Sequence, residues 1–595
     1  MMKKTRYGLL AAAVVMAVSG GTLGVSAAAS PSAQNLDNVV QVIEFRTDGM
    51  DPAKAQSLLA GYDVDPGSAN SGTIIGSHRV ALDLAAKGIK VVKETPYGSD
   101  FTPVPGANAR AAAAASPLPE RVKNNSYETY FGGYKTIAAY QKLATDIASA
   151  YPEFAQYVDY GDSWQKTKGQ GGHDLFALRI TANANDGSDW KTNTNHKPRF
   201  VFSGQIHARE IIGSEFVSRF TADILNGYGT DPEATALLDS TEVWVVFGSN
   251  PDGIATVEKG LKTAATTSSG DGNPAANNTA WQRKNMDTDG YTGGSSDYTQ
   301  SQPGIDLNRN WSTGWGGQGT SNDPSDQSYR GKGPLSEPES KQQADFFSQL
   351  FGKFTVTGNT PAPDSRQGTV LNLHSFSNLV IYPYAYDNTV IPPNIAAIKN
   401  LGFRQSFYNG FKTGAAGDVI YNAAGGDIDT IYQQNGIPAY TWEIGTSSQG
   451  GFFPAFSRTA GLYNQYRGGI FYAANAASAP YKTPAGPTVT SLTASRNSDK
   501  SVSINATGND NAFGTNPSNR KPAAQNVTAA EYSVGKLPAA AGSGTALALS
   551  DGSANSTTES FNGTAGNVAD GKQTIFVRAK DADGNWGPAK AVFVQ

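Results

Sequence analysis

The sequence predicts an α/β protein whose central sheet is buried on both faces, and three observations lead to this prediction. The chain has 595 residues, too many for one ordinary hydrophobic core, so we expect several segments with separate roles. Between residues 121 and 482, apolar strands alternate with helical patterns, as in sheets covered by helices on both faces. From residue 483 onward, short alternating strands rich in Ser, Thr, Gly and Asn predict a separate Ig-like or fibronectin-like β-sandwich.

The composition excludes several classes of function. The chain carries 47 Lys and Arg against 51 Asp and Glu, and its net charge of −4 gives no general field for attracting nucleic acid or an anionic membrane. It has no cysteine, which excludes disulfide scaffolds, thiol nucleophiles and Cys-bound metals. Only five histidines are available for an imidazole-based site: His78, His173, His196, His207 and His374.

Residues 1–29 have the order of a signal peptide. Three basic residues precede an apolar run from residue 9 to residue 18, and small residues then lead to Ala27 and Ala29, after either of which we expect cleavage. The alternative, a membrane anchor, needs roughly 20 apolar residues, about twice the length of this run. We therefore expect a secreted, extracellular protein without a membrane span, and the absence of cysteine favours a bacterial source.

Residues 30–120 have the pattern of a small α+β segment followed by a linker. We expect two helices and two strands, over residues 52–59, 81–86, 39–45 and 90–92. A stretch rich in Pro and Ala follows, and its basic residues Arg110 and Arg121 predict a processing site. We interpret this segment as a removable pro-segment, and the alternative is a permanent domain on a flexible linker.

The two remaining segments contain the predicted elements of the sheet and of the sandwich. Residues 121–482 contain a predicted helix over 136–150 and predicted strands over 175–180, 200–203, 243–248, 370–373 and 439–442. Residues 483–595 contain predicted strands over 501–504, 530–534 and 574–579. After the last of these, Asp581, Asp583 and Asn585 either close a tight turn or bind calcium.

Two histidines and a glutamate stand where predicted strands end. His207 and Glu210 follow the strand at 200–203, and their spacing of three lets an imidazole and a carboxylate converge on one ion. His374 follows the strand at 370–373, so a neighbouring strand can present it at the same edge of the sheet. Two histidines, one glutamate and an open fourth position form the ligand set of a catalytic zinc that binds water.

Three further polar residues stand out by their position. Glu443 ends the apolar strand at 439–442, where a desolvated carboxylate needs a partner or a function. Beside zinc-bound water it can act as a general base, and the alternative is a structural ion pair. Asn308 and Arg309 lie in a weakly charged loop, where they can recognise a small carboxylate or simply lie on the solvated surface.

Together these residues resemble those of the zinc carboxypeptidases of the carboxypeptidase A-like (funnelin) family. The matching motifs follow the family's order across residues 125–480: His207-x-x-Glu210, Asn250-Pro-Asp-Gly253, Arg283-Lys284, Asp306-x-Asn308-Arg309-Asn310-Trp311, Tyr329-x-Gly331 with Ser336-Glu-Pro-Glu339, Leu373-His374-Ser375 with Tyr382-Pro-Tyr384, Ile420-Tyr421 with Gly425-Gly426-x-x-Asp429, and Trp442-Glu443. The resemblance implies a mixed, twisted eight-stranded sheet flanked by helices. It also fits the pro-segment, because zymogen precursors are common in this family.

The resemblance implies one zinc ion on His207, Glu210 and His374, with Glu443 as the general base. It also implies that Arg283 polarises the scissile carbonyl and stabilises the oxyanion. The surrounding loop departs from the family pattern, because Gln282 stands where an aromatic residue often precedes this arginine and Met286 replaces a second arginine. These departures bear on the packing of the loop, since neither position carries the chemistry.

The resemblance also implies the residues that bind substrate. Asn308 and Arg309 would hold the C-terminal carboxylate, and the hydroxyl of Tyr421 would close over the site. Arg209 matches a position that contacts the substrate upstream of the scissile bond. Ile428 would line the base of the side-chain pocket, which predicts a preference for hydrophobic or aromatic C-terminal residues. The neighbouring Asp427 would tolerate a basic residue instead.

We therefore expect a secreted, monomeric zinc metallocarboxypeptidase, a peptide hydrolase. It would remove C-terminal residues by zinc-activated water from peptides or proteins with a free C-terminus. One alternative is a relative that acts on cell-wall or D-amino-acid peptides. Another is a binding protein whose sandwich does the work while the metal domain is silent, although a scaffold would not need three zinc ligands together with Glu443 and Arg283.

Overall fold

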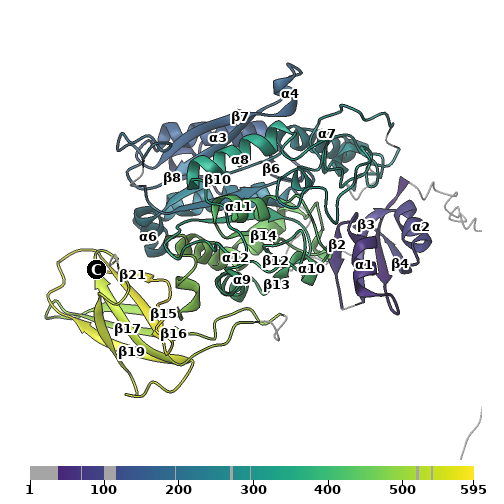
Figure 1. The fold of residues 1–595 in the computed structure, drawn as a ribbon. Helices are drawn as coiled ribbons and strands as arrows, with labels where there is room; N and C mark the ends of the chain where they lie inside the picture. The colour runs from purple at the N-terminus through teal and green to yellow at the C-terminus, as the bar shows by residue number, and fades with distance from the viewer. Residues whose placement is uncertain are drawn as a thin grey trace, which may run out of the picture. The chain divides into compact units, whose positions relative to one another are not determined.

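The computed structural model describes residues 38–68, 70–98, 116–193, 196–267, 273–294, 296–516, 521–537 and 540–595 (Figure 1). The predicted signal peptide at 1–29 and Arg110 of the predicted processing stretch lie outside these residues. Within the described ranges, no helix has both the length and the apolar character needed to cross a membrane.

Residues 40–96 form a small sheet with two helices. The strands lie in the order β2-β3-β1-β4 and all pair antiparallel. Leu59 of the first helix and Val80 of the second pack on Ile43 and Ile74 of the sheet. The first helix begins after Asp51, whose carboxylate accepts a hydrogen bond from the Lys54 amide at 2.9 Å. The elements are β1 (Val40–Arg46), α1 (Pro52–Leu59), β2 (Val64–Pro66), β3 (Ser71–Ser77), α2 (His78–Ala86) and β4 (Lys90–Pro96).

An eight-stranded mixed sheet follows, in the order β13-β12-β14-β11-β9-β10-β8-β7. The four central strands, β14, β11, β9 and β10, run parallel to one another. Antiparallel pairings join β12 to β14, β10 to β8 and β8 to β7. The strands are β7 (Ala155–Asp162), β8 (Asp174–Ile180), β9 (Arg199–Gly204), β10 (Glu242–Val246), β11 (Thr369–His374), β12 (Leu379–Tyr382), β13 (Lys412–Ala415) and β14 (Ala439–Glu443).

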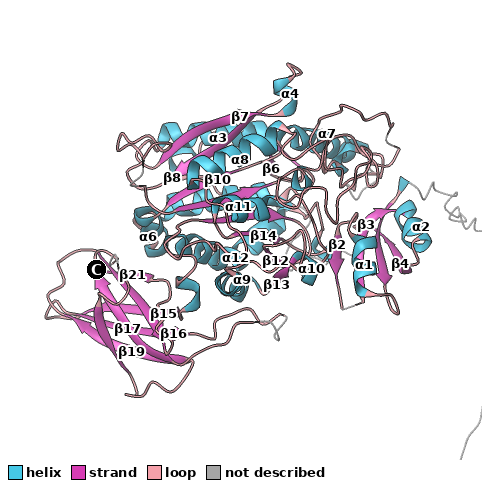
Figure 2. Ribbon diagram, viewed as in Figure 1, coloured by secondary structure: helices cyan, strands magenta, loops and turns pink. Residues whose placement is uncertain are grey.

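The central strands are apolar at almost every position because both faces of the sheet are covered. Phe200 and Phe202 of β9 pack into one core, mainly with α3, α5, α9 and α12, whereas Val201 between them packs into a second core with α8 and α11. The alternation of side chains along a strand therefore places successive apolar residues in two different cores. Figure 2 shows these helices in cyan around the magenta strands.

Ten helices and a two-stranded ribbon complete this part of the chain. The ribbon consists of β5 (Thr129–Tyr130) and β6 (Tyr134–Lys135). The helices are α3 (Ile137–Ala150), α4 (Trp164–Thr167), α5 (Ile212–Gly227), α6 (Pro232–Ser240), α7 (Pro251–Thr267), α8 (Pro338–Phe351), α9 (Ile395–Asn409), α10 (Ala416–Val419), α11 (Asp427–Asn435) and α12 (Phe456–Asn475).

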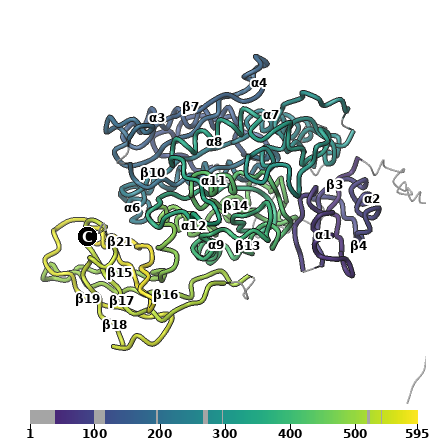
Figure 3. Tube along the Cα trace, viewed as in Figure 1, coloured from purple at the N-terminus to yellow at the C-terminus, as the bar shows by residue number. Residues whose placement is uncertain are grey.

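Residues 488–594 form a seven-stranded antiparallel sheet in the order β15-β16-β19-β18-β17-β20-β21, traced in green to yellow in Figure 3. Its core includes Val502, Phe561 and Val577. The carboxylate of Asp581 accepts a hydrogen bond from the Asn585 amide at 2.7 Å, the geometry of the predicted tight turn. The strands are β15 (Thr488–Arg496), β16 (Val502–Asn509), β17 (Val527–Val534), β18 (Thr545–Leu549), β19 (Thr558–Ala565), β20 (Gln573–Asp581) and β21 (Lys590–Val594).

A buried arginine is one of the residues that link the eight-stranded part to the C-terminal sheet. Arg404 on α9 is fully buried and forms an ion pair with Asp510 at 2.7 Å. Its guanidinium also donates to the carbonyls of Pro484, Gly486, Asp510 and Ala512, and it lies 3.7 Å from the ring centroid of Phe513. The last strands of the chain are thus attached to α9 by buried polar contacts.

The predicted fold class is confirmed: the chain has an α/β part with an eight-stranded mixed sheet, an α+β segment before it and a β-sheet segment after it. The prediction missed β2, β3, β7, β12 and β13, and in the C-terminal sheet it missed β15, β18, β19 and β21.

Candidate metal centre and active site

Three neighbouring parallel strands bring the predicted site residues to one edge of the sheet. Strand β11 pairs with β9 on one side, where Leu373 lies opposite Gly204, and with β14 on the other, where His374 lies opposite Glu443. His207 and Glu210 lie in the turn between β9 and α5, rather than on the helix itself. Because parallel strands end together, the turn after β9 and the ends of β11 and β14 meet at this edge.

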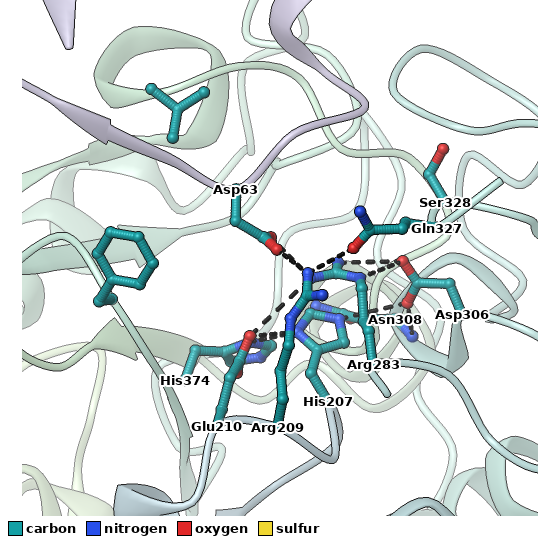
Figure 4. Close-up of polar contacts among 12 residues, drawn as sticks. Asp63, His207, Arg209, Glu210, Arg283, Asp306, Asn308, Gln327, Ser328 and His374 are labelled. Carbon is teal, nitrogen blue, oxygen red and sulfur yellow. Dashed lines mark hydrogen bonds and ion pairs between the residues drawn. The ribbon is translucent and has the colours of Figure 1, made fainter. Parts of the chain in front are cut away.

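The side chains of His207, Glu210 and His374 converge within one small volume, and each is almost completely buried (Figure 4). Their ligand atoms all lie within 4.8 Å of one another. His207 Nδ1 lies 2.8 Å from Glu210 Oε1, and His374 Nδ1 lies 3.0 Å from Glu210 Oε2 and 3.1 Å from His207 Nδ1.

This arrangement fits a zinc ion. Two imidazole nitrogens and the Glu210 carboxylate face one point. Nitrogen and oxygen donors in a His₂Glu set are ligands that zinc takes in catalytic sites. Burial alone would raise the pKa of Glu210, but the neighbouring imidazoles of His207 and His374 hold it below its ordinary value. The carboxylate is therefore ionised and ready to bind a cation.

Asp306 orients two members of the site. Its Oδ1 lies 3.2 Å from His207 Nε2, the ring nitrogen that points away from the ligand cluster, and its Oδ2 accepts a hydrogen bond from Arg283 Nε at 3.0 Å. Asp306 is fully buried, which by itself would raise its pKa, but Arg283 and Arg309 hold the pKa well below the ordinary range. An ionised carboxylate on the outer nitrogen fixes the tautomer and the ring direction of a metal-binding histidine.

Glu443 lies partly exposed to the cavity at the end of β14. Burial raises the pKa of Glu443 well above its ordinary value, and the negative charges of Glu210 and Asp63 raise it further. No ion pair within the described residues engages Glu443, so the structural ion pair considered as an alternative is not present there. Its carboxyl is free to exchange a proton with a group in the cavity.

The loop that carries Asn308 and Arg309 faces the same cavity. Asn308 Oδ1 accepts a hydrogen bond from the Asp427 amide at 3.1 Å, and Arg309 Nε donates to the Gly319 carbonyl at 2.7 Å. In the described part of the chain, Arg309 lies within ion-pair distance of no carboxylate. Its buried charge is therefore available to an anionic ligand.

All the predicted site residues except Arg209 line one cavity. Tyr421 and Ile428 are buried in its wall, and burial raises the pKa of the Tyr421 hydroxyl, so this group is a neutral donor. The rest of the wall beyond the metal ligands is mostly small and apolar, comprising Ile381, Ala385, Ala416, Ile420 and Ala423.

Arg209 and Arg283 share a carboxylate from the N-terminal sheet. Asp63, which directly precedes β2, accepts a hydrogen bond from Arg283 Nη1 at 2.8 Å with one oxygen and binds Arg209 Nη2 with the other (Figure 4). Burial would raise the pKa of Asp63, but Arg283 and Arg209 hold it below the ordinary value. Arg209 also donates to Gln327 Oε1 at 2.6 Å and packs on the ring of Phe452.

The loop around Arg283 is held by glutamine side chains. Gln282, which replaces the family's aromatic residue, is fully buried and donates to the carbonyls of Lys284, Asn285 and Pro303. Gln302 Oε1 accepts a hydrogen bond from the Arg283 amide at 2.6 Å. An amide in place of a ring therefore fastens the loop by hydrogen bonds instead of by apolar packing.

The sequence reasoning did not assign a role to three of these residues. Asp306 stands in a quoted motif, and its position two residues before Asn308 was the available signal. Gln302 and Asp63 had no comparable signal in the sequence, because both act through contacts with residues distant in the sequence.

Comparison with known proteins agrees with this geometry. The model of the Peptidase_M14 family, zinc carboxypeptidase, matches residues 140–464. Carboxypeptidase A1 of Rattus norvegicus is 26% identical over 327 residues, which cover 54% of this chain and 65% of that protein. A protein of Arthroderma otae named inactive metallocarboxypeptidase ECM14 is 25% identical over 301 residues, 50% of this chain and 43% of that protein.

Among solved structures, the carboxypeptidase A of Helicoverpa armigera has the same fold, with a TM-score of 0.55 at 20% identity, covering 75% of this chain and 99% of that one. The chain thus spans about two thirds of the rat relative's length and nearly all of the insect structure. Because the family model matches more than half of the chain, this protein belongs to the zinc carboxypeptidase family.

Proposed function

We propose that this chain hydrolyses the C-terminal peptide bond of peptides or proteins that have a free C-terminus. The proposal depends on what one cavity contains: three residues of the type that bind zinc, the carboxyl of Glu443, and the charge of Arg309, which has no carboxylate partner among the described residues. A scaffold that only bound metal would need neither Glu443 nor Arg309. The zinc carboxypeptidase family supplies the reaction class.

Substrate binding follows from the charges around the cavity. Arg309, with Asn308 beside it, would hold the terminal carboxylate, and this contact makes the enzyme an exopeptidase. The side chain of the last residue would then lie against Ile428 and the small apolar wall, which favours hydrophobic residues. Tyr421 would donate its hydroxyl to the bound terminus.

Proton transfer and charge stabilisation fall to Glu443 and Arg283. A zinc ion held by His207, Glu210 and His374 supplies Lewis-acid polarisation of the water and of the scissile carbonyl when it is bound. Glu443, whose pKa is raised first by burial, would take the proton from the attacking water and deliver it to the leaving amine.

Arg283 would donate hydrogen bonds to the oxygen on which negative charge develops. Asp306 supports this role because it holds the Arg283 guanidinium in place.

We further propose that residues 30–120 are an inhibitory pro-segment of a secreted precursor. Asp63 occupies Arg283 and Arg209, and Tyr421 packs in the core of the N-terminal sheet. Arg121 is bound to the Ala150 carbonyl and to Glu153, at 2.8 and 2.6 Å, which favours processing upstream of it. The mature enzyme would then comprise the catalytic domain, up to residue 482, and the sandwich, 483–595.

A cell-wall or D-amino-acid peptide hydrolase and a catalytically silent binding protein remain the alternatives, and the monomeric state remains a prediction. The test is release of amino acids from peptide pairs with free and amidated C-termini. The full chain is used after its 99–115 stretch has been cut and the N-terminal segment has been released by dilution, with and without a zinc chelator. We expect chelator-sensitive release from free C-termini only. Release from neither peptide, with zinc still bound, would refute the proposal.

A further inference from the structure

Glu337 lies where two loops of the candidate site meet, although it does not line the cavity. It directly precedes α8, and only 3% of its surface is exposed. One of the two loops, the Arg283 loop, comprises residues 282–285, and the other, the Arg309 loop, comprises residues 306–310. Glu337 forms hydrogen bonds with both loops.

The side chain of Glu337 holds the Arg283 loop through Asn285. Its Oε2 accepts a hydrogen bond from Asn285 Nδ2 at 2.8 Å. Asn285 is fully buried and pairs with Ile305, because its amide donates to the Ile305 carbonyl at 3.0 Å and its Oδ1 accepts from the Ile305 amide at 2.8 Å. Ile305 directly precedes Asp306, the residue that holds the Arg283 guanidinium. A displacement of Asn285 would therefore reach Arg283 from two directions.

The same residue holds the Arg309 loop through Asn310. The Glu337 amide donates to Asn310 Oδ1 at 3.1 Å. Its Oε1 accepts from Ser336 Oγ at 2.9 Å, and Ser336 Oγ in turn accepts from Asn310 Nδ2 at 2.9 Å. Asn310 directly follows Arg309, so Glu337 connects the loop of the proposed oxyanion donor with the loop of the proposed carboxylate clamp.

A second buried carboxyl group shares the donor on Asn285. Glu339 Oε2 accepts from the same Asn285 Nδ2 at 3.2 Å, and its Oε1 accepts from the Trp164 amide at 2.8 Å. Among the described residues, no lysine, arginine or histidine forms an ion pair with Glu337 or Glu339. Two buried carboxylates without a cation repel each other, so this arrangement favours uncharged carboxyl groups.

The pKa values agree with this charge pattern. Burial, followed by the negative charge of Asp287, raises the pKa of Glu337 to about 7. Burial, followed by the charge of Glu337, raises the pKa of Glu339 to about 8. The other titratable groups around these three acids are Tyr329, Asp252, Asp289, Lys168 and Lys332. Around neutral pH, the junction of the two loops therefore begins to gain negative charge.

We propose that Glu337 is a positioning residue that couples the Arg283 loop to the Arg309 loop and so fixes the oxyanion donor relative to the carboxylate clamp. This inference rests on the proposed function. The folded protein favours the uncharged form of Glu337, and that contribution is lost as the pH rises through about 7. Repulsion from Asp287 would then loosen both loops and slow hydrolysis.

The test compares how kcat/KM depends on pH for a peptide that ends in phenylalanine. The protein is the full chain, cut in its 99–115 stretch and freed of the N-terminal segment by dilution. Glu337→Gln keeps an acceptor for Asn285 but cannot ionise. We expect the ratio of its kcat/KM to that of the wild type to rise tenfold or more between about pH 6 and pH 8.5, because only the wild type loses an uncharged group. An unchanged ratio would overturn the proposal.

Glu258 provides the matched control. It is a second buried glutamate, on α7, and burial raises its pKa to about 7 as well. Its carboxylate accepts from the Ile137 amide at 2.6 Å, at the start of α3. Glu258→Gln should leave the ratio independent of pH. An equal rise in both variants would mean that the ratio reports overall stability, and it would overturn the role of Glu337.

Asp287→Asn tests the same coupling from the opposite side and does not depend on whether Glu337→Gln folds. The substitution removes the negative charge that, after burial, raises the pKa of Glu337. Glu337 would then ionise more readily, so the loss of activity should move to lower pH. No movement, or movement to higher pH, would contradict the proposal.

Failure of the inference and failure of the proposed function give different results. If the wild type cleaves the peptide but the ratio for Glu337→Gln stays flat, only the role of Glu337 is wrong. If the wild type cleaves no peptide, the proposed function is wrong, and amide hydrogen exchange then tests the coupling without turnover. At about pH 8.5, residues 283–285 and 305–310 should be better protected in Glu337→Gln than in the wild type, and equal protection would overturn the coupling.

Discussion

Asp63→Asn should weaken the binding of the N-terminal segment to the rest of the chain by a large factor. The substitution keeps the shape of the side chain but removes the negative charge that bridges Arg283 and Arg209. Both guanidinium groups are at least 95% buried, so they would remain desolvated while facing a neutral amide. Truncating one partner of such a pair costs about 2–5 kcal/mol, which is roughly 30- to 4000-fold in Kd.

The assay uses the full chain after its 99–115 stretch has been cut, so that the N-terminal segment is held only by its contacts. Serial dilution releases the segment, and the rate of peptide hydrolysis at each dilution reports the fraction released. Asp65→Asn is the matched control. Asp65 lies two residues away and is also half-buried, but among the described residues its carboxylate accepts hydrogen bonds only from the Ser447 amide and hydroxyl, at 3.0 and 3.1 Å.

We expect Asp65→Asn to change the Kd of the segment by less than about tenfold, as for neutral hydrogen bonds. Equal effects of the two variants, or an unchanged Kd in Asp63→Asn, would refute the reasoning that the two arginines hold the segment by charge.

The same contact predicts how segment binding depends on pH. Burial would raise the pKa of bound Asp63, but Arg283 and Arg209 hold it below the ordinary value. A carboxyl whose pKa is depressed by binding contributes fully above its free pKa of about 3.9 and loses that contribution as the pH falls through the bound value. The wild-type segment should therefore bind more weakly below about pH 4, and Asp63→Asn should lack this part of the pH dependence.

Two further predictions concern the proposed general base and the attachment of the C-terminal sheet. Glu443→Gln should retain zinc, as measured by metal analysis, and lose about 100- to 10,000-fold in kcat because a general base is removed; near-wild-type turnover would refute the assignment. Arg404→Met should detach the C-terminal sheet and expose the connection at 478–488 to added protease, because five acceptors lose a buried donor. Arg496→Met, which removes carbonyl contacts only within that sheet, should leave the connection protected.

Within the eight-stranded sheet, the strands that the sequence predicted have buried residues on both faces. β9, β11 and β14 are apolar at nearly every position because successive side chains enter two different cores. β7 and β13 are the outermost strands of the sheet. Most residues of β7 are exposed or half-buried, whereas β13 is largely buried but has only four residues, Lys-Thr-Gly-Ala, none of them large and apolar. Their polar residues weaken the apolar pattern, so that the sequence gives no clear strand signal there.

The three residues of the candidate metal centre could be predicted because the ends of neighbouring parallel strands meet at one edge of the sheet. To predict that His374 and Glu443 lie close together, it is enough to infer that their two apolar strands are parallel neighbours. The pairing register places the two residues opposite each other. Asp63 could not be found in this way. It lies 220 residues from Arg283 in the sequence, and nothing in its local pattern distinguishes it from any other surface acid.

If the proposed pro-segment and substrate site are right, Arg209, Arg283 and Arg309 would connect inhibition with substrate binding. Arg209 and Arg283 share Asp63, whereas Arg309 has no carboxylate partner in the described chain. Without the N-terminal segment, Arg209 would keep only neutral partners, Gln327 and the Trp281 carbonyl. Departure of the segment therefore increases the positive potential at the cavity, where the substrate brings a terminal carboxylate. The positive charges of the arginines that bind Asp63 would thus also attract the negatively charged C-terminus of a peptide.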